Sequence, residues 1–452
     1  MPGSTETPRV IGGLGAFALV AGSMLGIGIF LSPPIVAGLV SDPRVFLLVW
    51  VAGGLTALAG AVACAELGTM MPEAGGDYVF QYEAYGPSVA FASGWVLFAA
   101  IFCGSIATMS VGLCTYQLPA LLGIDLSGPV AALPWVGPVS GAQAAALFLV
   151  PVLTLLNALG ARPSARAQTV LTALPIALLA LWAAWAVARG GAGAPEPEAA
   201  APAALTLGAL VAAYNAVYFA YSGWINVIYV GGEVQAPQRN IPRALVLGTV
   251  AVTALYVLLC LGFIRVLGMP GLAGAGEAGA ATAATVGGEP ARLLLTVLIA
   301  CALLASINAT VLGGARVAQA MALRGAIWSK LSRLDARRAV PLRALWLQAV
   351  LSCLLILSGR FDQLYVMVSL AMVLTGTLTV GSVFVLRRSR PTAQRPYRAT
   401  AYPWLPGLYV ASSLLVIGVM VQRAVSGEPD AWYPLLGLGL FGAAYVGHRV
   451  LR

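Results

Sequence analysis

The sequence predicts an all-α integral membrane protein with about twelve transmembrane helices. Of its 452 residues, 60% are hydrophobic and only 9% are charged, whereas a soluble domain carries about 25% charged residues. Apolar segments recur along the chain at the length of about 20 residues that a helix needs to cross a bilayer. The basic residues gather in particular connections between those segments, as expected of a polytopic protein. We therefore interpret residues 1–452 as one domain that crosses the membrane repeatedly.

The first half of the chain, residues 10–189, contains five predicted helices separated by connections rich in proline and glycine. These residue types interrupt helices because proline lacks an N–H donor and glycine loses much conformational entropy on folding. The connections lie at residues 41–44, 71–78 and 119–142. The predicted helices span residues 10–40, 45–70, 87–118, 143–159 and 167–188.

The second half, residues 205–388, contains five more predicted helices, and residues 401–450 add two at the end of the chain. Connections rich in glycine, alanine or arginine separate these helices, at residues 190–204, 269–290, 316–343 and 387–400. The predicted helices span residues 205–231, 243–268, 291–315, 344–358, 363–386, 401–422 and 431–447.

The formal net charge of the chain is +9, from 25 Lys and Arg against 16 Asp and Glu. When the N-terminus is placed in the cytoplasm, the basic residues gather in the loops on one side of the membrane. With twelve spans, the basic segments 316–343 and 387–400 then both face the cytoplasm, as the positive-inside rule requires. We interpret the charge as a signal of topology and not of nucleic-acid binding. We expect a multi-pass protein of the plasma membrane with both termini cytoplasmic.

An irregular stretch, VAGSMLGIGIF, occupies residues 20–30 inside the first predicted helix. It holds Gly22, Gly26 and Gly28, and a glycine in a helix interior costs about 1 kcal/mol relative to alanine. In a bilayer, backbone freed from a helix is tolerated only where it is buried in protein or lines a cavity. We expect this helix to break at residues 23–28. The alternative is that Gly22 and Gly26 form a small-residue face for close helix packing.

A second irregular stretch, Ser222 and Gly223 beside Trp224, lies in the sixth predicted helix. Five spans separate the two stretches, so the first and sixth helices cross the membrane in opposite directions. Two five-helix units of opposite orientation, each opening with an interrupted helix, are typical of secondary transporters. Half-helix N-termini suit a carboxylate and unwound carbonyls suit an ammonium group, so the two stretches together favour a small zwitterion.

Three motifs follow one another along the chain: GSMLGIGIF at residues 22–30, AELGTMMPEAGGDY at residues 65–78, and FAYSGW at residues 219–224 with GEVQAPQRNIP at residues 232–242. Together they resemble motifs of the amino acid–polyamine–organocation (APC) superfamily of permeases, and most closely the L-type amino acid transporter-like group and its bacterial relatives. The resemblance implies secondary active amino acid transport by alternating access. It also implies a LeuT-type fold of two inverted repeats, residues 10–189 and 205–388, with two extra helices in residues 401–450.

The resemblance also assigns roles to residues at the two breaks. The substrate carboxylate is expected beside the Ser23 hydroxyl, at the backbone N–H groups of Gly26, Ile27 and Gly28. The substrate amine is expected at the carbonyls of Met24, Phe219, Ala220 and Ser222. The Phe219 ring resembles the aromatic group that closes over bound substrate, and Trp224 is either a supporting contact or ordinary packing. On the third helix, Gly104 and Ser105 are expected to line the side-chain pocket.

Two departures from the family pattern bear on coupling. Relatives often have a serine between the last two glycines of the first motif, where this chain has Ile27. Many relatives also have a lysine in the fifth helix that stands in for a sodium ion, and alignment through Gln168 places Pro175 at that position. A fixed positive charge beside the first helix is therefore missing, which leaves exchange and proton coupling both open.

Glu66 is the acidic residue that the sequence places well inside a span, and intramembrane carboxylates are functional-site hypotheses by default. We consider it a candidate for proton coupling, with snorkelling or backbone capping near the membrane surface as the alternative. Glu233 is expected to order its loop with Arg239 or Arg243. No acidic residue falls at a predicted pocket position, and an unpaired cation would be costly there, so we predict neutral amino acid substrates.

Other functional classes find little support in the sequence. The six cysteines lack metal-ligand spacing, and the single histidine, His448, lies near the C-terminus, so we expect no metal, no cofactor and no enzymatic activity. A channel would need a continuous polar pore. The alternatives left open are a cationic amino acid or polyamine antiporter or exporter of the same fold, and an amino acid sensor or channel on a transporter scaffold. The direction of transport, the oligomeric state and any partner subunit stay open.

Overall fold

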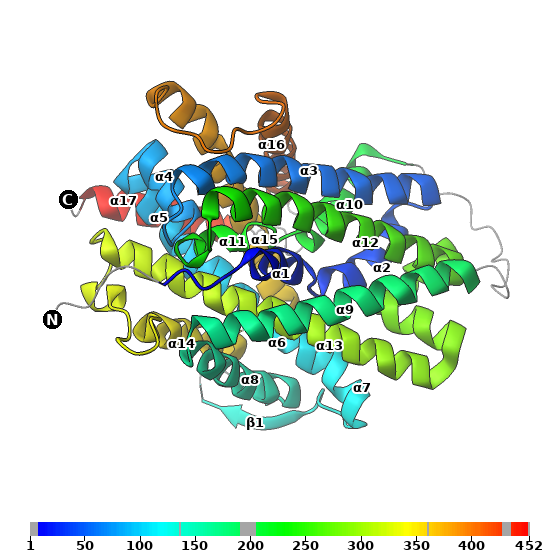
Figure 1. The fold of residues 1–452 in the computed structure, drawn as a ribbon. Helices are drawn as coiled ribbons and strands as arrows, with labels where there is room; N and C mark the ends of the chain where they lie inside the picture. Colours follow the sequence, from blue (N-terminus) through cyan, green and yellow to red (C-terminus); the bar gives the residue numbers. More distant parts are fainter. Residues whose placement is uncertain (1–7, 135–136, 190–204, 359–360, 427–434, 451–452) are drawn as a thin grey trace.

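The computed structural model describes residues 8–134, 137–189, 205–358, 361–426 and 435–450. Within them the fold is all-α apart from one short hairpin, which confirms the predicted fold class. Long helices run side by side along one axis, and the first described residues lie at the same end of the bundle as the last helix (Figure 1). We call this end the terminal end. The predicted connection at residues 190–204 lies outside the described residues.

The first half of the chain contains nine α-helices, two π-helical segments and two strands among the residues described. Local signals set several starts: Asp42 caps the helix that begins with Pro43, and Ser140 and Gln143 form a reciprocal capping box. In order, the elements are α1 Gly13–Met24, α2 Gly28–Leu39, α3 Pro43–Met70, α4 Asp77–Tyr85, α5 Pro87–Trp95, η1 Val96–Phe102, α6 Cys103–Gly112, η2 Leu113–Gln117, α7 Leu118–Leu122, β1 Pro129–Leu133, β2 Gly137–Ser140, α8 Gly141–Ala158 and α9 Ala161–Arg189.

The second half contains the remaining helices. Two of them kink at a glycine with positive φ, Gly268 in one and Gly288 in the other. In order, the elements are α10 Leu207–Ala220, α11 Asn226–Tyr229, η3 Gly231–Glu233, α12 Pro237–Ala273, α13 Ala278–Leu323, η4 Ser329–Ser332, α14 Leu342–Ser358, α15 Phe361–Ser389, α16 Trp404–Val425 and α17 Leu435–Val450.

Each predicted span has a counterpart in the structure. Among the described residues, nine helices are long and apolar enough to cross a membrane, counting α1 with α2 and α5 to α7 as one span each. Two shorter apolar helices, α10 and α14, and the terminal helix α17 complete the predicted order. The chain is therefore a multi-pass membrane protein. The division into inverted repeats stays a prediction.

Three predicted connections were wrong in detail. Residues 278–290 are helical, because Glu277 caps α13 through the Ala280 N–H at 3.2 Å and Gly288 then kinks the helix without ending it. The same helix continues to Leu323, into the predicted basic connection. The predicted loop at residues 119–142 contains the antiparallel pair β1–β2, which no alternating apolar pattern had signalled.

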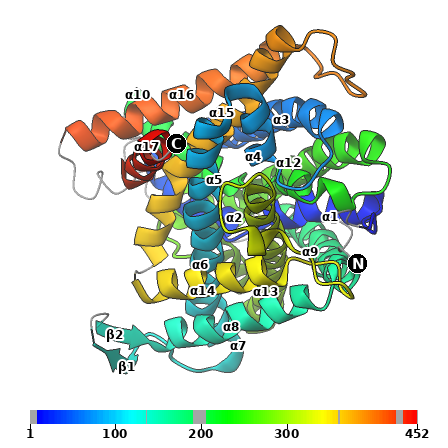
Figure 2. The same ribbon diagram turned by 90° about the vertical axis from the view of Figure 1, so that its left-hand side faces the viewer.

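The two C-terminal helices lie on the outside of the bundle (Figure 2), where α16 packs against α3 and α15, and α17 packs against α5. At the terminal end, the segment before α1 pairs with the segment after η3. The Ile11 N–H donates to the Glu233 carbonyl, and the Gln235 N–H donates to the Ile11 carbonyl, each at 2.9 Å. Ile11 is buried, so this pairing fixes the segment before α1 to the segment between η3 and α12.

Candidate functional site

The first predicted break is present. The helix α1 ends at Met24 and α2 begins at Gly28, because Leu25 leaves the helical region at ψ 71°. The Gly26 N–H folds back to the Met24 carbonyl at 2.7 Å. The N–H groups of the first turn of α2 have no partner within that helix, so this turn presents donors and the positive end of a helix dipole.

The second predicted break is also present, between the end of α10 at Ala220 and the start of α11 at Asn226. The Ser222 N–H donates to the Phe219 carbonyl at 2.9 Å, which closes a tight turn. Gly223 then takes a φ of +97°, a conformation that residues with a Cβ rarely adopt.

The two breaks lie against each other. The Ser23 hydroxyl is 2.7 Å from the Gly223 carbonyl. A Cβ atom on Gly223 would lie 2.5 Å from the Ser23 carbonyl oxygen, and one on Gly28 would lie 2.6 Å from the Ala220 Cα. The backbones of the two breaks are therefore in contact at two points. Only glycine, which has no Cβ, allows so close an approach.

The packing alternative holds for a different glycine of the same motif. A Cβ on Gly22 would lie 2.1 Å from the Thr172 hydroxyl oxygen and 2.5 Å from the Gln168 side-chain nitrogen, both on α9. Both side chains also lie within 3.3 Å of the Ala18 carbonyl. Pro175 lies one turn further along α9 and is buried. Gly22 thus serves close packing, whereas Gly26 and Gly28 belong to the break.

Two side chains from other helices hold the opened backbone, and no sequence pattern predicted either of them. The Tyr256 hydroxyl of α12 lies 2.5 Å from the Met24 carbonyl and 3.1 Å from the Ala220 carbonyl, so it links both breaks. The Ser306 hydroxyl of α13 donates to the Ser23 carbonyl at 3.0 Å. Buried carbonyls that have left a helix need such donors.

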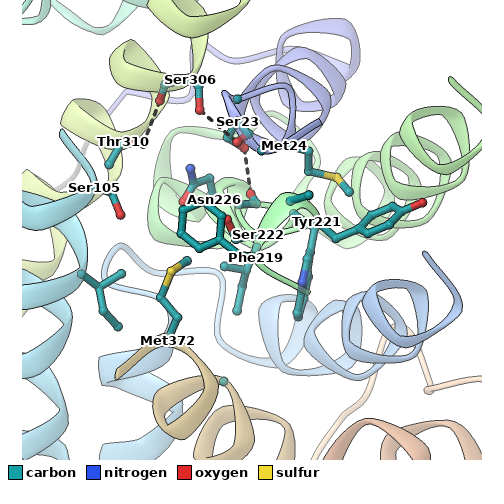
Figure 3. A pocket seen from close by; sticks show the side chains of 18 of the residues that line it. Ser23, Met24, Ser105, Phe219, Tyr221, Ser222, Asn226, Ser306, Thr310 and Met372 are labelled. Atoms are coloured by element: carbon teal, nitrogen blue, oxygen red, sulfur yellow. Dashed lines mark hydrogen bonds between the residues drawn. The ribbon is translucent and has the colours of Figure 1, made fainter. Parts of the chain in front are cut away.

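A cavity of about 120 Å³ lies at the two breaks, room for on the order of ten waters and so for a small amino acid. In Figure 3, Ser23, Ser306 and Thr310 lie on one side, Met372 lies on the other, and the Phe219 ring stands between them. The lining combines backbone of both breaks with hydroxyl, aromatic and thioether side chains. Besides the predicted residues it includes Asp77, Thr108, Met109, Tyr218, Tyr221, Asn226, Tyr229, Ser306, Thr310, Met372, Thr375 and Tyr409.

Most of the predicted site residues line this cavity. They are Ser23, Met24, Gly26, Ile27, Gly28, Ser105, Phe219, Ala220, Ser222 and Trp224. Gly104 does not line it, because successive residues of a helix point about 100° apart and Ser105 is the one that faces the space. Glu66 does not line it either. Trp224 packs edge-on against Tyr409, so it serves both the lining and the packing.

Glu66 is buried between two arginines near the terminal end. Its carboxylate accepts from Arg387 at 2.6 and 3.0 Å, from Arg395 at 3.1 Å and from the Ala399 N–H at 2.7 Å. It therefore ties α3 to α15 and to the segment that follows α15. Because four N–H donors from three residues already occupy this carboxylate, the geometry favours a structural role over proton coupling.

Glu233 pairs with Arg316 of α13, and not with the predicted Arg239 or Arg243. Both partners are about 1% exposed. Burial raises the pKa of the Glu233 carboxyl and the Arg316 charge opposes that rise. The sequence missed this partner because Arg316 lies in the continuation of α13 that was predicted to be a connection.

Asp77 is the acidic residue in the cavity lining, and sequence reasoning missed it because it lies in a Pro/Gly-rich connection. It is the first residue of α4 and is 3% exposed. The Tyr229 hydroxyl donates to its Oδ2 at 2.7 Å, while its Oδ1 is buried without a hydrogen-bond partner. Burial raises the pKa of this carboxyl to about 7, against the opposing effects of the Tyr229 and Thr379 hydroxyls.

Residues 11–443 match a protein family described as amino acid permease. The chain is 29% identical over 420 residues to the serine/threonine exchanger SteT of Bacillus subtilis (strain 168), covering 91% of this chain and 90% of the relative. It is 27% identical over 400 residues to the human b(0,+)-type amino acid transporter 1, covering 88% and 80%. It is 25% identical over 430 residues to the human large neutral amino acids transporter small subunit 2, covering 94% and 78%.

Proposed function

Because this chain belongs to the amino acid permease family, it is a secondary transporter of amino acids and not an enzyme, and we propose that the cavity between the two breaks binds a neutral amino acid. The observation that carries the proposal is the contact between two interrupted helices, whose opened backbone faces one small cavity. Backbone recognises the α-carboxylate and α-amine that amino acids share, which leaves the side chain to be selected by the rest of the lining.

We place the carboxylate at the start of α2, where Ile27 and Gly28 supply N–H groups and the helix dipole favours negative charge. The Gly26 N–H would have to leave the Met24 carbonyl to join them. The ammonium group is placed at the carbonyls of the second break, at Phe219 and Ser222. The carbonyl oxygens of Met24 and Ala220 also lie within hydrogen-bond distance of the Tyr256 hydroxyl. A carbonyl oxygen has two lone pairs, so Ala220 retains one for the substrate, whereas the Met24 carbonyl already accepts from the Gly26 N–H as well.

The preference for neutral side chains rests on the chemistry of the lining. Apolar and hydroxyl groups such as Ser105, Thr310 and Met372 offer no charge to a guanidinium or an ammonium side chain. Such a cation would stay unpaired at low dielectric, which is costly. Asp77 is the observation that favours the alternative, a cationic substrate, and a competition assay separates the two. The names of two relatives, an exchanger of serine and threonine and a transporter of large neutral amino acids, support the neutral reading.

We place the terminal end in the cytoplasm of a cell whose plasma membrane holds the transporter, because the basic segments 316–343 and 387–400 then obey the positive-inside rule. Inverted repeats, residues 10–189 and 205–388, would move against each other about the fixed cavity. Exchange is the favoured mode, since one relative is named an exchanger.

Purified protein in liposomes tests the proposal. Liposomes loaded with unlabelled amino acid should take up labelled serine, alanine or leucine faster than empty ones, with saturation. Excess arginine or a polyamine should compete poorly. Uptake that is driven best by arginine would establish the cationic alternative, and linear, non-saturating flux would indicate a channel. Binding without flux would indicate a sensor.

A further inference from the structure

Among the described residues that line the cavity, Asp77 is the one carboxyl group, and it has no cation partner. Asp77 lines the cavity and is almost fully buried, and only one of its two oxygens accepts a hydrogen bond. None of the ion pairs among the described residues includes it. A buried carboxylate without a cation partner loses favourable solvation, so such a group tends to take up a proton or a cation instead.

The titratable groups that interact with Asp77 are a thiol and three phenols from four neighbouring helices, and such groups are ordinarily neutral near pH 7. They are Cys64 of α3, Tyr218 of α10, Tyr229 of α11 and Tyr409 of α16. From α15 its polar neighbour is Thr379.

We propose that Asp77 is a proton-binding site of the transport cycle, protonated while the cavity is closed over and ionised when its end of the cavity opens to water. The proposal rests on the transport function proposed above and adds the ion that this function uses. Protonation makes the lining neutral, which suits a neutral substrate. It also assigns the coupling role to Asp77 in place of Glu66, whose carboxylate already has arginine partners.

The direction of the pH effect follows from linkage. In water an aspartate has a pKa of about 4, and burial raises the pKa of Asp77 to about 7. Closing the cavity therefore takes up a proton, and closure becomes harder as the pH rises from the lower value to the higher one. Above the higher value the penalty is constant, because the carboxylate is then ionised in both states.

The experiment measures exchange of a neutral amino acid in liposomes with the same pH on both sides. Wild-type exchange should fall at least about tenfold between about pH 5 and about pH 7 and then level off. Asp77→Asn keeps the acceptor for Tyr229 but cannot ionise, so its exchange rate should not change with pH. Tyr229→Phe removes the hydrogen bond that favours the charged form, so its fall should continue to a higher pH than in the wild type.

Glu73→Gln is the matched control, because it removes a carboxylate four positions away that is 58% exposed and paired with Arg324. Its pH profile should equal that of the wild type. A flat wild-type profile, or a wild-type profile in Asp77→Asn, would overturn the proposal. Should Asp77→Asn fail to fold, an unshifted Tyr229→Phe profile would overturn it equally. A wild type that exchanges no neutral amino acid at any pH would instead refute the proposed function.

Discussion

The Ser23 hydroxyl lies 2.7 Å from the Gly223 carbonyl, which joins the interruption of the first membrane helix to that of the sixth across 200 positions of sequence. This contact places the donors of one break and the acceptors of the other around one cavity. It also fixes which residues tolerate substitution, because the backbones approach too closely for a side chain at Gly223 or Gly28.

Gly223→Ala should reduce transport at least about tenfold. Alanine at a φ of +97° is strained by about 1–2 kcal/mol, and its Cβ would lie 2.5 Å from the Ser23 carbonyl oxygen. The two breaks must then separate. Gly38→Ala in α2 is the control, because a Cβ there meets nothing within 4 Å. Equal uptake by the two variants in liposomes would contradict the close approach.

Tyr256→Phe should weaken substrate binding, because it removes the donor that holds the Met24 and Ala220 carbonyls. A buried acceptor left without a partner costs about 1–3 kcal/mol, so KM should rise roughly tenfold. Tyr214→Phe is the control, since its hydroxyl bonds Thr56, away from the breaks. If both variants keep the wild-type KM, Tyr256 does not organise the site.

Ser105→Phe should narrow substrate selection. Ser105 lines the cavity from α6, and the added ring would fill space that a large side chain needs, an overlap that costs about 1–3 kcal/mol. Leucine and phenylalanine should lose affinity, while alanine and serine keep it and serve as the internal control. Equal loss for small and large amino acids would show that Ser105 does not face the substrate side chain.

Glu66→Gln should lower stability without altering the pH profile of transport. Breaking a buried ion pair costs about 3–5 kcal/mol, and Glu66 is 1% exposed and bound to Arg387 and Arg395. Thermal unfolding in detergent measures the loss. Glu289→Gln, from a pair with Arg292 in which Glu289 is 61% exposed, should leave the unfolding temperature nearly unchanged, because solvent screens exposed ion pairs. A Glu66→Gln protein with a flattened pH profile would restore Glu66 as the coupling group.

The order of the helices and the positions of both breaks could be predicted from the sequence. This is because the free-energy cost of a glycine inside a membrane helix depends on local sequence alone. A glycine in such a helix indicates an interruption whatever surrounds it, as at Gly26, Gly28 and Gly223. Boundaries were less certain, as in α13, where Gly288 and Pro290 only kink a helix that they were expected to precede.

Groups that reach the site from elsewhere could not be predicted. Tyr256 and Ser306 are ordinary residues of apolar helices until folding brings them to the opened backbone. Asp77 lies in a segment rich in proline and glycine, which is typical of an exposed turn, yet it is buried beside Tyr229. Contacts of this kind depend on tertiary packing and leave no local pattern.

The central claim is that opened backbone at the two breaks binds the charged groups of an amino acid. The most direct test is an experimental structure of the transporter with a bound neutral amino acid. The carboxylate should lie within hydrogen-bond distance of the N–H groups of Gly26, Ile27 or Gly28, and the ammonium group should lie at the carbonyl of Phe219 or Ser222. An amino acid bound elsewhere, or unbroken helices through both stretches, would contradict the account.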